Sequence, residues 1–111
     1  MGETYNLERS ILASLLSSEI EVEIDKNYFT NTFHQKLAVG INRLKELQLS
    51  VDFELLRNSY IKAKKWTFEE DNMLTDIMIN TTPFGSHKIV EDYINVLKES
   101  YRNNLDRRYA I

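Results

Sequence analysis

Acidic side chains are the first residues of this chain whose spacing suggests chemistry. Glu19, Glu21, Glu23 and Asp25 occupy alternate positions, and carboxylate oxygens are the ligands that Ca²⁺ prefers in proteins. A period of two sends the four side chains to one side of an extended segment, and no glycine lies among them to fold the chain around an ion. We therefore expect a solvated acidic edge rather than a cation site.

The two histidines also have no spacing typical of a metal site. His34 and His87 are far apart in the sequence, and neither has a Glu-x-x-His neighbour. We expect His34 at the start of a helix and His87 in a loop or helix cap. The chain contains no cysteine, which excludes disulfides, thiolate zinc sites and cysteine nucleophiles.

Glycine is too sparse for a phosphate-binding loop. Gly2, Gly40 and Gly85 stand alone, and none lies in a G-x-x-x-x-G-K-[ST] frame, in which backbone amides would wrap an anion. The sequence therefore predicts no ATP binding, no metal, no other cofactor and no catalytic residues. We expect that this chain is not an enzyme.

One cluster combines positive charge with an aromatic ring, as single-strand binders do. It consists of Lys62, Lys64, Lys65 and Trp66. The formal net charge of the chain is −3, which is unfavourable for contact with a nucleic-acid backbone. We expect at most weak binding of single-stranded DNA, with Trp66 anchoring a loop on the core.

The first half of the chain reads as two helices separated by a connector. Asn6 is placed to cap a first helix over 7–16, and the strictly alternating stretch 19–25 has no second strand to pair with, so an extended connector or a short irregular helix is expected there. Asn31 or Thr32 caps the next helix. The residues expected on the buried faces of the two helices are Leu7, Ile11, Leu12, Leu15 and Leu16, then Phe33, Leu37, Ile41, Leu44 and Leu47. The residues expected to point away from the core in the second of them are Lys36, Asn42, Arg43 and Glu46.

The second half predicts three more helices. Asp52 can cap a helix that ends before Lys62, and Thr67 with Glu70 has the spacing of a capping box for a helix over 68–79. A loop over 80–85 leads to a last helix from about 86 to the end. The residues expected to be buried in these helices are Leu55, Leu56 and Tyr60, then Met73, Leu74, Ile77 and Met78, then Ile89, Tyr93, Leu97, Tyr101 and Leu105.

The elements together predict an all-α fold, a compact bundle of about five to six helices. Residues 1–111 form one domain, with no repeat or internal boundary. No stretch reaches the length of a signal peptide's apolar region or of a membrane span. The cytoplasm is the expected location.

Several segments, in order, resemble the N-terminal domain of DnaB-type replicative DNA helicases. The segment 8–16 is similar to that family's opening Glu-x-Ser-hydrophobic-Leu-Gly-Ser-Leu-Leu, and Phe29 and His34 have the spacing of its Phe-x-x-x-x-His. The segment 51–56 looks like its Val-Asp-x-x-x-Leu helix start, and 80–83 lies where the family has an Asn-Thr-Pro loop. Tyr93 falls where its last helix carries tyrosine, so the resemblance extends over most of the chain.

The resemblance implies a role in DNA replication. In such helicases the N-terminal domains form a collar on a hexameric ring of RecA-like ATPase domains, and the collar communicates with primase and the helicase loader. This chain would be a fragment that lacks the C-terminal ATPase domain, where ATP and Mg²⁺ bind and which translocates on single-stranded DNA. Two alternatives remain open, the helicase-binding C-terminal domain of a primase and a stand-alone helical DNA-binding module.

The end of the last helix is the expected partner surface. Its apolar stripe continues beyond the part that a bundle of this size can cover, and arginines surround it. Exposed apolar faces rimmed by polar residues often mark interfaces. The residues of this predicted interface are Tyr101, Arg102, Leu105, Arg107 and Arg108.

Overall fold

Five α-helices and one short 3-10 helix make up the computed structural model, which describes the backbone of residues 2–17, 20–63, 65 and 67–109 and the side chains of 4–17, 20–59, 65 and 67–103. The elements are α1 (Gly2–Ser17), η1 (Lys26–Tyr28), α2 (Thr32–Glu46), α3 (Phe53–Ala63), α4 (Phe68–Asn80) and α5 (His87–Tyr109). The described part of the chain contains no strand. The predicted all-α class and the number of helices are confirmed.

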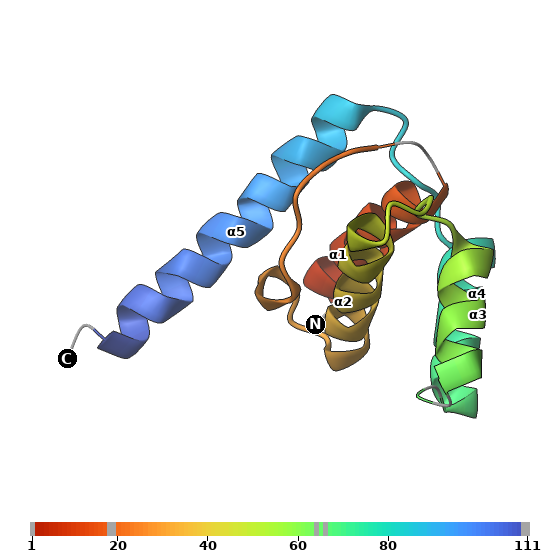
Figure 1. The fold of residues 1–111 in the computed structure, drawn as a ribbon. Coiled ribbons are helices and arrows are strands. Elements are labelled where there is room, and N and C mark those ends of the chain that lie inside the picture. Colours follow the sequence, from red (N-terminus) through yellow and green to blue (C-terminus); the bar gives the residue numbers. More distant parts are fainter. Residues whose placement is uncertain (1, 18–19, 64, 66, 110–111) are drawn as a thin grey trace.

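Helix α1 is the centre of the fold. Residues 11–16 are buried without interruption, as expected for a helix that is covered on several sides. Helices α2, α4 and α5 all contact α1, and Figure 1 shows α3 and α4 on one flank of the α1–α2 pair and the long α5 on the other. Asn6 does not cap α1, because the helix begins at Gly2, a turn earlier than predicted.

The helix starts that the sequence predicted at three polar residues are confirmed. The Asn31 side chain accepts from the backbone N–H groups of Phe33 and His34. Asp52 accepts from the second and third residues of α3, and Thr67 and Glu70 form a complete capping box at α4. Each cap satisfies backbone donors that have no partner within the helix.

The connector before α2 is extended over residues 20–25. Of the two predicted conformations, an extended connector and a short irregular helix, the first is the one found. Its aliphatic side chains face inward and its acidic side chains are exposed. Two side chains of α2 donate hydrogen bonds to carbonyls of this segment, as a neighbouring strand would. Lys45 Nζ donates to the carbonyl of Val22 at 2.7 Å, and Asn42 Nδ2 donates to the carbonyl of Ile24 at 2.9 Å. The alternating sequence pattern therefore forms a strand-like strap that α2 holds.

The predicted buried face of α2 is correct as far as Leu44, but Leu47 is exposed. The helix ends at Glu46, and Leu47 is its C-terminal cap residue. Gln48 then adopts a left-handed backbone conformation with φ of 59°, and the N–H of Leu49 donates to the carbonyl of Leu44. This turn rotates Leu47 away from the helix face that packs on the core.

Two predicted outward residues of α2 instead make contacts inside the fold. Lys36 forms an ion pair with Glu70 of α4 at 2.6 Å, and Asn42 holds the strap. A second pair, Arg9 with Asp76 at 2.6 Å, joins α1 to α4. These contacts place α4 against both central helices.

Helices α3 and α4 also differ from prediction in detail. Leu56 is buried, but Leu55 is exposed, and Tyr60 lies outside the described side chains. Helix α3 continues to Ala63, past Lys62. In α4 the predicted burial of Leu74 and Ile77 is confirmed, Met73 is half-buried and Met78 is exposed.

The register of α5 differs from the predicted one. The fully buried residues are Val90, Ile94 and Leu97, whereas Ile89 and Tyr93, which we expected in the core, are 42% and 38% exposed. Leu97 is shared by both patterns. The physical reason is that α5 carries two neighbouring apolar rows, and the packing partners α1 and η1 cover only one of them.

Candidate functional site

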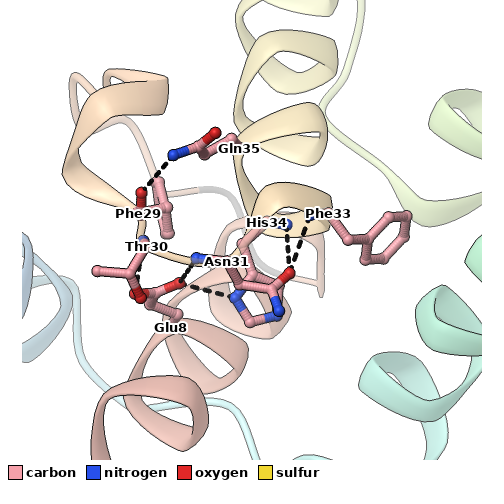
Figure 2. Close-up of polar contacts among 7 residues, drawn as sticks. All are labelled: Glu8, Phe29, Thr30, Asn31, Phe33, His34 and Gln35. Carbon is pink, nitrogen blue, oxygen red and sulfur yellow. Dashed lines mark hydrogen bonds and ion pairs between the residues drawn. The ribbon is translucent and has the colours of Figure 1, made fainter. Parts of the chain in front are cut away.

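A buried carboxylate forms the most highly connected polar site among the described residues. Glu8 projects from α1 into the turn between η1 and α2, and neither its side chain nor that of His34 is accessible to solvent. Figure 2 shows the Glu8 carboxylate in contact with Thr30 and Asn31 of that turn and with His34 of α2. One oxygen lies 2.8 Å from Nδ1 of His34, and the other accepts from the backbone N–H and the hydroxyl of Thr30.

The charge of Glu8 suits its position at the start of α2. Its first oxygen also accepts from the backbone N–H of Asn31 at 3.4 Å, so the carboxylate faces the positive end of the α2 dipole. Burial raises the pKa of Glu8, but the hydrogen bonds from His34 and Thr30 outweigh it and leave the pKa below the usual value of 4.5. Because an ionised carboxylate only accepts hydrogen bonds, Nδ1 of His34 carries the proton and donates it.

Aromatic packing encloses this buried pair. The ring of Tyr5 stacks on the ring of His34 at 5.0 Å between centroids, and the Arg9 guanidinium lies over the Tyr5 ring, 5.6 Å from its centroid. The site is therefore closed to a substrate. Within the described residues no group of three His, Cys, Asp or Glu side chains is placed to hold a metal ion.

The structure separates the other residues that the sequence singled out. Glu21, Glu23 and Asp25 are exposed along the strap, and Glu19 lies outside the described residues. His87 begins α5, and its Nε2 lies 3.2 Å from the carbonyl of Glu21.

The predicted basic cluster is described only in part. Lys65 is exposed, and its carbonyl accepts from Lys36 Nζ. The side chains of Lys62, Lys64 and Trp66 lie outside the described residues.

Only the first two residues of the predicted interface have described side chains. Tyr101 is half-buried and its ring lies 6.3 Å from that of Tyr28 in η1. Arg102 is exposed and pairs with Glu99 on the same helix. The side chains of the remaining three, Leu105, Arg107 and Arg108, lie outside the described residues.

An exposed apolar row on α5 is the surface that sequence reasoning missed. Ile89, Tyr93 and Val96 lie three and four residues apart and are between 38% and 52% exposed, so they form one continuous stripe. Tyr93 is held in place by stacking on Phe84, with ring centroids 4.8 Å apart. The signal in the sequence was the presence of two apolar rows, one more than a single packing partner can cover.

Comparisons of the chain with models of protein families, with characterised proteins and with solved structures find no match. Among the described residues, no helix is both long enough and apolar enough to cross a membrane.

Proposed function

We propose that this chain is a non-catalytic interaction domain, the N-terminal collar domain of a DnaB-type replicative helicase. It associates with copies of itself and contacts a primase or a helicase loader. The ATP- and Mg²⁺-dependent motor that unwinds DNA belongs to the remainder of the parent protein. The observation that carries the proposal is the exposed apolar row of α5.

The positions of the residues behind the resemblance support this proposal. Glu8, Phe29 and His34 are all buried, and Glu8 joins the first helix to the start of the second. Asp52 caps α3. Residues that determine helix caps and core contacts are those that two chains with a common fold would share.

The charges around the α5 row favour a second copy of the chain as its occupant. Lys88, Asp92 and Glu99 border the row on one side, with the positive charge toward the start of the helix and Glu99 toward its end. If two α5 helices cross antiparallel near Tyr93, Lys88 of one copy lies opposite Glu99 of the other, and this contact would replace the exposed pairs that each makes within its own helix. A two-fold axis makes this contact twice.

The charge distribution is less favourable to the DNA-binding alternative. The sequence of α4 contains Glu69, Glu70, Asp71 and Asp76 and no basic residue. Three of these carboxylates pair with basic residues of other helices, but the formal net charge of the chain, −3, is unfavourable for phosphates, and the exposed apolar row has no role in a module that reads DNA. These two features support a protein partner over a nucleic acid.

Sedimentation velocity over a range of concentrations tests the role of the α5 row. The variant Ile89→Ser/Val96→Ser is expected to remain folded, because both residues are exposed, and to associate about tenfold more weakly than the wild-type chain. The matched control is Met78→Ser/Ile79→Ser, which removes two exposed apolar side chains from α4 and is expected to leave association unchanged. A monomeric wild-type chain at all concentrations, or equal weakening by both variants, would contradict the proposal.

A further inference from the structure

A groove of about 940 Å³ lies between the strap and the turn that follows α2. Residues 20–23 form one wall and residues 48–52 form the other. We call it the strap groove. Its apolar surface comes from both walls and from the end of α1, with contributions from Leu16, Ile20, Val22, Leu49 and Val51.

The polar lining of the strap groove is mainly acidic. Glu21, Glu23 and Asp52 contribute three carboxylates, against the single ammonium group of Lys45. That ammonium group already donates to the carbonyl of Val22. Burial lowers the pKa of Lys45, and the charges of Glu21 and Glu23 act in the opposite direction. Asp52 also caps α3, so the excess negative charge of the groove comes from Glu21 and Glu23, which face the single ammonium group of Lys45.

The strap also offers an unused backbone donor. The N–H of Val22 donates to no atom of the described residues and shares an edge with the Val22 carbonyl that Lys45 holds, whereas the N–H groups of Glu21 and Glu23 point to the opposite edge, where His87 contacts the Glu21 carbonyl. A carbonyl of a second extended segment in the groove can accept from the Val22 N–H. Alternate side chains of such a segment would then reach the apolar surface, and the others would reach the carboxylates.

We propose that the strap groove binds an extended, positively charged peptide segment of a partner protein, in which lysine or arginine alternates with aliphatic residues. The Val22 N–H supplies a backbone hydrogen bond, and the Glu21 and Glu23 carboxylates select for positive charge. The site is separate from the α5 row, and the inference does not depend on the identity of the parent protein.

The test is an NMR titration of the ¹⁵N-labelled chain with the acetylated, amidated heptapeptide Lys-Val-Lys-Leu-Lys-Val-Lys. Saturable shifts below about 1 mM peptide are expected, confined to the amides of 20–24 and 45–52. The same peptide with glutamate in place of lysine is expected to cause no shifts. Shifts centred on other elements, or the absence of saturation by the lysine peptide, would overturn the proposal.

Two charge-matched variants distinguish this site from general attraction to an acidic protein. Glu21→Gln/Glu23→Gln is expected to weaken binding about tenfold, because it removes two charges from the groove. Glu69→Lys changes the net charge by the same two units at one exposed position on α4 and is expected to change the affinity less than about twofold. Equal weakening by the two variants would show that the attraction is not local and would overturn the proposal.

Discussion

Replacing Glu8 with alanine is expected to lower the free energy of unfolding by about 2 to 5 kcal/mol, one of the largest effects of any single substitution in this chain. The substitution leaves His34 Nδ1, which water does not reach, without its acceptor, and it also removes the acceptor of the Thr30 backbone N–H. It also removes the negative charge from the start of α2. Urea unfolding followed by circular dichroism measures the loss.

Glu99→Ala is the control for this prediction. Glu99 is exposed, and its contact with Arg102 is an ion pair between neighbouring turns of one helix, so its removal is expected to cost less than about 0.5 kcal/mol. Similar losses for the two variants would mean that the Glu8 carboxylate contributes no more than a surface acid, and the buried polar site would then be misassigned.

The pH dependence of stability provides a second measurement of the same site. The native pKa of Glu8 lies below its usual value of 4.5, so the unfolded chain takes up a proton at this residue before the folded chain does. The stabilisation is therefore complete above pH 4.5 and is lost as the pH falls through the lowered native pKa. The stability difference between the wild-type chain and Glu8→Gln should shrink over that range and stay constant above it.

Ile94→Ala is the second substitution expected to have a large effect. Ile94 is 3% exposed in the row of α5 that packs on the core, and its truncation should lower the free energy of unfolding by about 2 to 5 kcal/mol. Ile89→Ala is the same chemical change on the exposed row and should cost about 1 kcal/mol or less. Equal losses in thermal or urea unfolding would contradict the register of α5.

Local features of the fold were predictable because their causes are local. A cap depends on residues within one turn, so the sequence limited the cap of α2 to Asn31 or Thr32 and identified Asp52 and the Thr67–Glu70 box. The alternating pattern of 19–25 left two conformations open, an extended connector and a short irregular helix, and the first is the one found over 20–25. The pattern did not identify the partners of this segment, because Asn42 was expected on the outward face of its helix and nothing was predicted for Lys45.

Features that depend on tertiary packing were not predictable in the same way. Glu8 has the sequence position of an ordinary polar residue near a helix start, and its burial follows from a histidine and a threonine more than twenty positions away. In α5 both apolar rows have helical spacing, so periodicity alone could not decide which one faces α1. For the same reason, the sequence did not single out the exposed row of Ile89, Tyr93 and Val96 as a candidate surface.

A spin label on α5 tests most directly whether two copies of the chain meet through this helix. The chain has no cysteine, so a nitroxide attached to Ser100→Cys is placed at one position, on the exposed side of α5 that continues the row of Val96. The spin-labelled variant, at natural isotope abundance, is mixed with ¹⁵N-labelled wild-type chain, which carries no spin label. Broadening of the ¹⁵N-detected signals then reports contacts between copies only. The collar proposal predicts broadening of the amides of 89–103, and no such effect from a label at Glu69→Cys on α4. Broadening confined to α4, or none at concentrations where the chain associates, would contradict the proposal.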